Sequence, residues 1–514
     1  MSDHSLNNKR IARNTLFLYV RMIIVLLITL YTSRVVLKVL GVEDYGIYGV
    51  VGGFVSLFAI FNNSFTSSII RFYNAAIGRG RKDELTNTFK TAFIMQLLLA
   101  IVVVVMVEVV GFWYIRHKMV LPPERLSSAW IIFHLSVISM ALTIIQAPFS
   151  AMIQAQEKMD YFALVSITAA FIGLGNVFIL KACGEDKLLV YGFLQLGIAV
   201  VTFLMYAIYC RCKFESVRIG KNKGRELGRK MVAFSGWSLL EPIAYTMRGQ
   251  GSNMVLNFFF GPAINAAFSL SNQIANALDH FTGSVSVAFT PQLIQSYTAG
   301  ENHRTKNLVL SMTKINYSLQ LMLSLPLIVE LNYVLGLWLG ADIPAYTASF
   351  AAYILVIKTI NSLQNPLTKV VQATGRIRTY MTISSILVAA SLPLGYAFLK
   401  MGYPADSIYL VMVILTAINL FACVFMASRV FPDLGIKEYC LRVAIPCALC
   451  SAICFIAVKL PSWFMPDSFS RLILTCLSSV ISVGLVAFFL LLDNNERSFV
   501  SGVIDKYLKK IRER

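Results

Sequence analysis

Apolar runs of about 20 residues follow one another through almost the whole of this chain, which is the length that a helix rising about 1.5 Å per residue needs to cross a hydrocarbon core of about 30 Å. Of the 514 residues, 57% are apolar and 14% are charged. Soluble domains carry about 25% charged residues. The pattern therefore predicts an all-α polytopic membrane protein with about fourteen transmembrane helices.

The predicted membrane spans form two sets of six and a final pair. We place them at residues 15–37, 47–72, 89–114, 128–153, 161–181, 189–210, 231–259, 265–295, 308–337, 347–371, 379–399, 408–428, 441–459 and 471–492. An even number of spans leaves both termini on the same side of the membrane.

Basic residues are unevenly divided between the loops of the two sides. With the N-terminus in the cytoplasm, the loops on that side hold about 28 Lys and Arg, and the opposite loops hold about 9. The most basic stretches are the 211–230 loop and the 506–514 tail. This bias predicts that both termini are cytoplasmic. We assign the net charge of +19 to contact with anionic membrane lipids and not to nucleic-acid binding.

Two helix ends about 218 residues apart are similar, which indicates an internal repeat. Residues 146–158 and 364–376 both begin Gln-x-Pro and continue to Gln-Ala, and Gly41 and Gly261 form a second pair at nearly the same offset. Both halves begin on the cytoplasmic side. The repeat therefore predicts two parallel six-helix lobes, 1–225 and 226–430, related by a pseudo-twofold axis along the membrane normal with a cleft between them. Residues 431–514 add two helices and the basic tail.

No motif in the sequence indicates an enzyme. There is no Walker A glycine loop and no nucleophile elbow, and the five histidines do not have metal-ligand spacing. We therefore expect a non-enzymatic protein without a cofactor or a bound metal. Its function should depend on the polar residues that lie inside the bilayer.

Cations at membrane depth are the first candidate site residues. Arg248 and Lys358 lie near the middle of their runs, where a charge costs about 3 kcal/mol on insertion scales unless it faces a partner or water. We expect Lys314, nearer a helix end, to extend its charged end to the interface. Three further candidates lie closer to the ends of the first two runs: Arg21, Arg34 and Arg71.

Polar residues share helical faces with the deep cations. Asn272, Asn276 and Asp279 lie on one face of the eighth run, and Tyr245 and Arg248 lie on one face of the seventh. Asp279 either neutralises Arg248 in a structural pair or lines a cavity together with it. Because deep cations outnumber deep carboxylates, we expect a cavity for an anionic substrate, and the polar stripe 62–68 suits a hydroxyl-rich ligand.

The first fifty residues carry a more particular pattern. They read Asn14-Thr-Leu-Phe-Leu-Tyr-Val-Arg21, then Tyr31-Thr-Ser-Arg34, then Leu40-Gly-Val-Glu-Asp-Tyr-Gly-Ile-Tyr-Gly49. With the repeat and the two extra helices, the chain resembles bacterial polysaccharide and O-antigen flippases of the Wzx type, in the multidrug/oligosaccharidyl-lipid/polysaccharide (MOP) exporter superfamily. The resemblance implies two lobes forming a V around a cationic cavity. It also implies an undecaprenyl-diphosphate-linked oligosaccharide as the substrate, moved from the inner to the outer leaflet.

Other functions stay open at this point. A cation-coupled drug efflux antiporter of the same superfamily would need deep carboxylates in the first lobe, where only Glu108 is available. A lipid II or teichoic-acid flippase is also compatible with the pattern. A polymerase or ligase acting on lipid-linked glycan would favour a large extracytoplasmic loop, and none exceeds about 15 residues. We expect a monomer in the bacterial cytoplasmic membrane, coupled to protons or sodium ions if it is coupled at all.

Reporter fusions will test the predicted topology. Fusions at residues 222 and 510 should both report a cytoplasmic location, because basic loops are retained on that side of the membrane. Alkaline phosphatase and green fluorescent protein serve as opposite reporters at each position. An external signal at either position contradicts the assignment.

Overall fold

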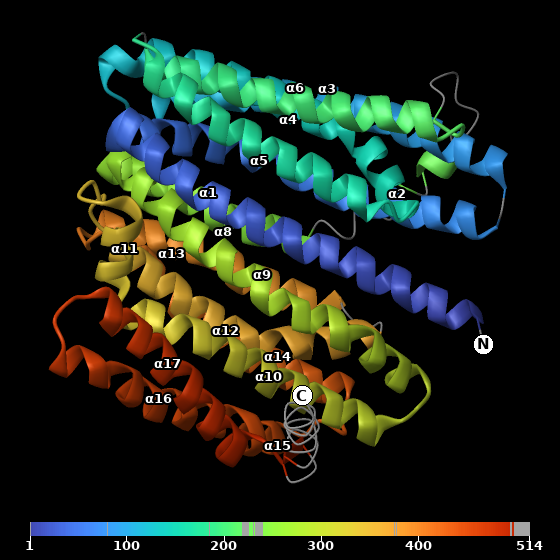
Figure 1. Ribbon diagram of the computed structural model, residues 1–514, viewed down its shortest axis with the longest axis vertical. Coiled ribbons are helices and arrows are strands. Elements are labelled where there is room, and N and C mark those ends of the chain that lie inside the picture. Colours follow the sequence, from blue (N-terminus) through green and yellow to red (C-terminus); the bar gives the residue numbers. More distant parts are fainter. Residues whose placement is uncertain are drawn as a thin grey trace, which may run out of the picture. The chain divides into compact units, whose positions relative to one another are not determined.

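In the computed structural model, the described residues are 2–79, 81–184, 186–217, 226–229, 231, 240–374, 376, 378–493 and 496–497. They form helices joined by short connections (Figure 1). Two compact units contain them: Met1–Leu270 with Ala341–Ala345, and Ser271–Gly340 with Tyr346–Arg514. The division into lobes at residues 225 and 430 stays a prediction.

The first unit consists of long helices and one short 3-10 turn. They are α1 (Ser2–Ser56), α2 (Ala59–Gly78), α3 (Lys82–His117), η1 (Pro123–Arg125), α4 (Leu126–Ala155), α5 (Met159–Ala182), α6 (Lys187–Lys213), α8 (Leu240–Phe260) and the first part of α9 (Pro262–Thr298). The long α1 is not continuous, because Gly41 has φ 80° and ψ 169°. This left-handed conformation favours glycine. It separates the first predicted span from the second, which continues into α2.

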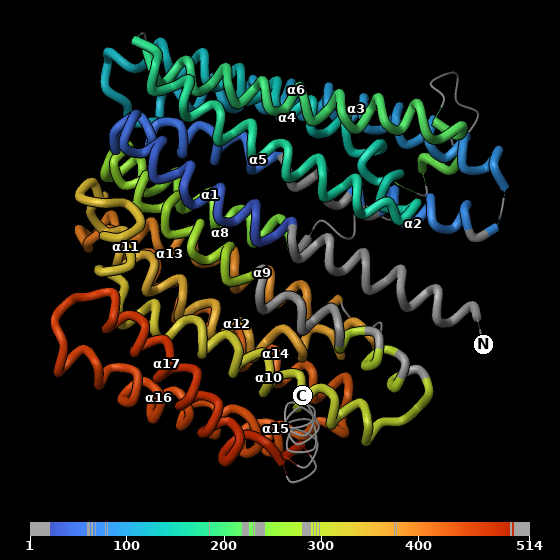
Figure 2. The backbone as a smooth tube through the Cα atoms, in the orientation of Figure 1, coloured from blue at the N-terminus to red at the C-terminus, as the bar shows by residue number. Residues whose placement is uncertain are grey.

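The second unit contains the rest of α9 and the C-terminal helices. They are α10 (Asn302–Val329), α11 (Leu331–Leu339), α12 (Thr347–Thr374), α13 (Arg378–Lys400), α14 (Ser407–Val430), α15 (Ile436–Tyr439), α16 (Ile445–Phe464) and α17 (Phe469–Val486), with π-helical turns η2 (Cys440–Ala444) and η3 (Ala487–Leu491). α10 and α11 meet at a bend of 78°. The backbone tube in Figure 2 shows α16 and α17 as a hairpin.

The expected fold class is confirmed, since the predicted spans lie on helix where the structure describes them, apart from breaks at residues 57–58, 330 and 492. Nine helices of the described part are long and apolar enough to cross a membrane, or ten if α10 and α11 form one bent span. Four long helices, α2, α8, α9 and α12, are too polar to pass the same hydropathy criterion. Polar helices inside a bilayer face other helices or water. These four are therefore the helices on which a site should be sought.

Helix positions and neighbours agree with an internal duplication. α3 and α10 begin about 220 residues apart, as do α4 and α12, α5 and α13, and α6 and α14. In the first unit α4 packs against α3 and α6, and α5 packs against α6 (Figure 1). In the second unit α12 packs against α10 and α14, and α13 packs against α14. Helices at equivalent positions of the predicted repeat thus pack against equivalent neighbours in the two units.

Small residues allow α1 to approach the start of α9 within the first unit. A Cβ atom on Gly46 would lie 1.9 Å from the carbonyl oxygen of Pro262, and one on Gly49 would lie 2.6 Å from Oγ of Ser269. Gly46 is also close to Ala266. Positions 46 and 266, and 49 and 269, are equivalent in the predicted repeat. Equivalent residues meet in this way when a contact lies on a twofold axis.

An ion pair buried in the second unit joins α10–α11 to α17. The Glu330 carboxylate is fully buried and the Arg471 side chain is 9% exposed. Nε of Arg471 donates to Oε1 of Glu330 at 2.9 Å, and the Thr475 hydroxyl donates to the same oxygen at 3.0 Å. Glu330 lies at the bend between α10 and α11, so the pair holds this bend against the last helix.

Our expectation that Lys314 of α10 extends to the interface stays a prediction, but its charged end is buried. Its side chain is 1% exposed, and its Nζ lies 3.1 Å from Glu496 and 3.2 Å from Asp493. These carboxylates follow α17 and lie about 180 residues further along the chain. A buried lysine is tolerated because two acids neutralise it. We call these three residues the Lys314 cluster.

Removing Arg471 alone should destabilise the protein more than removing both members of the Glu330–Arg471 pair. Arg471→Met leaves the buried Glu330 carboxylate without its cation, which costs about 3–5 kcal/mol, whereas the double variant leaves no buried charge. Glu330→Gln should cost less, because Nη1 of Arg471 still lies 2.5 Å from Asp467. Thermal unfolding of the purified protein in detergent measures this. Glu215→Gln is the matched control, because the Glu215–Lys82 pair has side chains 81% and 85% exposed and should contribute little. Equal losses in Arg471→Met and the double variant would contradict the prediction.

Candidate functional site

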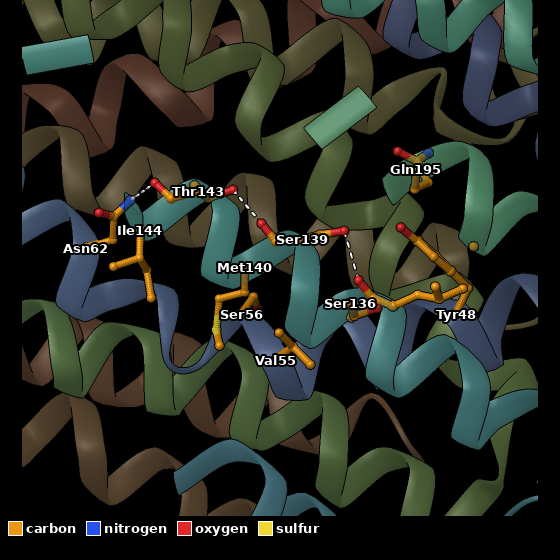
Figure 3. Close-up of a pocket in the computed structure, with 13 residues that line it drawn as sticks. Tyr48, Val55, Ser56, Asn62, Ser136, Ser139, Met140, Thr143, Ile144 and Gln195 are labelled. Atoms are coloured by element: carbon orange, nitrogen blue, oxygen red, sulfur yellow. Dashed lines mark hydrogen bonds between the residues drawn. The ribbon is translucent and has the colours of Figure 1, made fainter. Parts of the chain in front are cut away.

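A cavity of about 270 Å³ lies within the first unit, between α1, α2, α4 and α6 (Figure 3). It lies beside the middle of α4. Its lining residues are Tyr48, Gly52, Val55, Ser56, Asn62, Leu135, Ser136, Ser139, Met140, Thr143, Ile144, Gly192 and Gln195. None of these side chains carries a charge. The cavity therefore offers hydrogen bonds and apolar contacts to a neutral group.

Hydroxyl groups on α4 present acceptor oxygens to this cavity. Oγ of Ser139 donates to the carbonyl of Leu135, and Oγ1 of Thr143 donates to the carbonyl of Ser139, both at 2.9 Å. Each hydroxyl has a single proton, which these bonds use, and two lone pairs. The lone pairs are left for a ligand. Hydroxyl-rich ligands supply the matching donors.

Asn62 of α2 closes one end of the cavity. Its Nδ2 donates to the carbonyl of Thr143 at 3.4 Å, as Figure 3 shows. Its Oδ1 accepts from Nε2 of Gln96 on α3 at 3.5 Å. Gln96 is fully buried, and its Oε1 has no hydrogen-bond partner. Asn62 is thus held between α3 and α4, and its amide forms part of the polar face that a ligand meets.

The N-terminal sequence pattern positions one wall of the cavity. Asp44 is buried and lies 2.9 Å from Arg125 in η1, which also contacts Asp186 at the start of α6 at 3.3 Å. The Ser128 hydroxyl donates to Asp186 at 2.7 Å. Together these contacts fix the starts of α4 and α6 against α1. Tyr48, one turn after Asp44, then reaches the cavity.

Arg21, the predicted site residue nearest the N-terminus, lies against α5. Its Nη1 is 3.4 Å from Oγ of Ser166, and its guanidinium lies 5.1 Å from the centre of the Phe162 ring. Nε of Arg21 is buried without a hydrogen-bond partner. This nitrogen keeps a donor available. The remaining predicted arginines of α1 and α2, Arg34 and Arg71, are exposed.

Arg248 is half-buried on the polar helix α8. Its guanidinium lies 5.1 Å from the centre of the Tyr245 ring, as expected for residues that share a helical face. Stacking on an aromatic ring stabilises a cation at low hydration. Arginine carries planar donor groups that can bind an anion as a fork.

Asp279 and Lys358 form an ion pair between the polar helices α9 and α12, which the sequence did not predict. Both residues lie near the middle of their helices. The Asp279 side chain is 48% exposed and the Lys358 side chain is 25% exposed. Asn276 of α9 is exposed and Asn272 is half-buried. The structure thus brings together one predicted cation and one predicted carboxylate within the second unit.

Sequence reasoning found part of these features and missed others. Of the predicted stripe 62–68, Asn62 lines the cavity, while the Ser68 hydroxyl donates to the carbonyl of Met231 at 3.4 Å. The polar face of α4 was missed. The sequence does contain a pattern that indicates this face, since Ser136, Ser139 and Thr143 are spaced so that they lie on one side of a helix. Among the described residues, no three His, Cys, Asp or Glu side chains converge as a metal site.

Comparison with protein families gives two matches. Residues 11–297 match the family model described as polysaccharide biosynthesis protein. Residues 238–397 match the model described as MatE. No curated protein sequence matches the chain.

Solved structures of several membrane transporters share the fold. An inward-facing multidrug resistance MATE family transporter of the MOP superfamily aligns with a TM-score of 0.66 at 15% identity, covering 79% of this chain and 95% of that one. The lipid II flippase MurJ, in an inward closed conformation, aligns with a TM-score of 0.66 at 12% identity, covering 93% and 98%. A MOP superfamily transporter from Pyrococcus furiosus aligns at 0.60 with 16% identity, covering 82% and 96%.

Thiol labelling will show whether the cavity is hydrated. In a background with the exposed Cys212 and Cys476 replaced by serine, Ser139→Cys should react with a small charged methanethiosulfonate reagent. Ile138→Cys is the matched control, because Ile138 is 49% exposed but lies outside the cavity lining. A thiol facing lipid does not ionise and should not react. Equal, low labelling of both variants would contradict a hydrated cavity.

Proposed function

This chain belongs to the polysaccharide biosynthesis protein family within the MOP superfamily of transporters, and from that premise we propose that it is a flippase of the Wzx type. Its substrate is an undecaprenyl-diphosphate-linked oligosaccharide. The protein moves this lipid from the inner to the outer leaflet of the bacterial cytoplasmic membrane by alternating access. Both of its termini lie in the cytoplasm.

The observation that carries the proposal is the set of cations at membrane depth on the polar helices. Arg248 of α8 and Lys358 of α12 lie far from the ends of long helices. Charges at this depth are retained where they face a partner, water or a charged substrate. A diphosphate provides the anionic group that such cations bind, with arginine as a planar fork and lysine as a point charge. We place Arg21 on the path of the same group, with its free Nε donor.

The neutral cavity of the first unit supports the glycan half of the proposal. Its hydroxyl oxygens and amides suit sugar hydroxyls, and its lining has no charge that would compete for the diphosphate. Asn272 and Asn276 of α9 offer further amides beside Asp279. The prenyl chain stays in lipid and needs no polar contacts. The three chemical parts of the substrate thus meet three different environments.

A cation-coupled drug efflux antiporter is the second candidate, favoured by the MatE match and by one carboxylate of the first unit. Glu108 of α3 lies at membrane depth, 3.1 Å from Nδ1 of His134 on α4. An antiporter would use such a pair to bind its coupling cation. A strain lacking the gene separates the two candidates, because loss of a flippase removes surface glycan, whereas loss of an antiporter sensitises cells to cationic drugs.

Neutral substitution of the deep cations should abolish glycan export. In a strain that carries the variant as its single copy, Arg248→Ala or Lys358→Ala should lower surface glycan by about 10- to 100-fold. This is the factor expected from the loss of one hydrogen bond to a charged group. Asp279→Asn should have a milder effect. Immunoblots of membranes check that each variant is present at normal levels. Arg429→Ala is the control, since Arg429 is an exposed cation near the end of α14. Full surface glycan in an Arg248→Ala, Lys358→Ala double variant would refute the cationic mechanism.

A further inference from the structure

The Asp279–Lys358 pair differs from the other ion pairs that the structure places deep among its helices. The Glu330–Arg471 pair is buried, with side chains 0% and 9% exposed. Thr475 donates to Glu330, and Arg471 also contacts the exposed Asp467. The Asp279–Lys358 pair has side chains 48% and 25% exposed. Its helices α9 and α12 carry no other charged side chain near their middles in the described part. A partly uncovered pair of this kind can exchange partners, whereas a buried one cannot.

The Lys314 cluster makes the same contrast for lysine. Lys314 is 1% exposed and has two carboxylate partners, so an incoming anion cannot reach it. Lys358 has one carboxylate partner and a quarter of its side chain uncovered. An anion that approaches Lys358 must displace Asp279 or lie beside its negative charge. Two like charges about 4 Å apart repel by about 4 kcal/mol at an effective dielectric constant of 20, so Asp279 opposes the binding of anions.

We propose that Asp279 is an exchangeable counter-ion of Lys358. This inference rests on the proposed function and assigns a regulatory part to the same residues. Asp279 neutralises Lys358 while no substrate is bound, and the diphosphate of the lipid-linked substrate displaces it. About half of the Asp279 side chain is not covered by protein, so it can move away from Lys358.

The exchange serves two steps of a transport cycle. Competition from Asp279 weakens the binding of the diphosphate to Lys358, so the substrate leaves after it has crossed the membrane. It also restores a neutral pair in the empty protein. A neutral pair raises the free energy less than a lone ammonium group does when helices move within the bilayer. An isolated charge at the bilayer centre costs about 3 kcal/mol on insertion scales. Asp279 therefore favours release and return at the expense of affinity.

Equilibrium binding of inorganic pyrophosphate to the purified full-length protein in lipid nanodiscs tests the exchange. Asp279→Asn should bind pyrophosphate at least about tenfold more tightly than the wild type, because Lys358 has lost its competitor. Lys358→Gln should abolish this gain in the double variant. Glu215→Gln is the charge-matched control, since it removes one carboxylate that is 81% exposed and should leave the affinity unchanged. Asp279→Ser should behave as Asp279→Asn does, and it replaces that variant if the asparagine protein does not fold.

The possible outcomes separate this inference from the proposed function. Unchanged or weaker pyrophosphate binding by Asp279→Asn overturns the exchange. If Arg248→Ala and Lys358→Ala still lose glycan export in that case, the flippase stands without the exchange. Normal glycan export by the Arg248→Ala, Lys358→Ala double variant overturns both the exchange and the proposed flippase mechanism. Tighter binding that survives Lys358→Gln also overturns the exchange, because the gain then arises elsewhere.

Discussion

The hydrocarbon core of a membrane provides no hydrogen-bond partner and little solvation for a charge, and this constraint accounts for the placement of the charged side chains in this protein. Glu330 and Arg471 neutralise each other at the bend after α10, and Lys314 has two carboxylates. These contacts attach the final helix α17 to α10 at two places. Asp279 and Lys358 satisfy the same requirement less completely, because both stay partly uncovered. Burial therefore separates charges that hold the fold from the pair that we propose as part of the substrate site.

The start of the chain combines a turn, an ion pair and a close helix contact within ten residues. Gly41 interrupts the helix, Asp44 binds Arg125, and Gly46 lets α1 approach α9. A side chain at position 46 would collide with backbone, which cannot move aside. Since Tyr48 reaches the cavity from the same stretch, the contact that brings α1 against α9 also places one wall of the candidate site.

Membrane spans and candidate cations could be predicted from the sequence because they depend on local composition and depth. The helix ends and the positive φ angles of Gly41 and Gly261 fit the predicted repeat. Partners of the deep charges could not be found in the same way. Lys358 lies 79 residues from Asp279, and only the packing of α9 against α12 brings them together. For Lys314, helical depth suggested an interfacial position but could not reveal the two acids beyond α17 that bury its charged end.

The cavity and the deep cations have different chemistry, and this difference favours a substrate with distinct parts. Hydroxyls and amides line the cavity of the first unit without a charge, while Lys358 and Asp279 concentrate charge on the polar helices of the second. A small cationic drug would gain from carboxylates near its binding surface, and the described cavity lining has none. A lipid-linked glycan carries neutral hydroxyls and a diphosphate on one molecule. Under the proposed function, a neutral cavity and a separate ion pair suit a substrate whose two polar parts are bound by different chemistry.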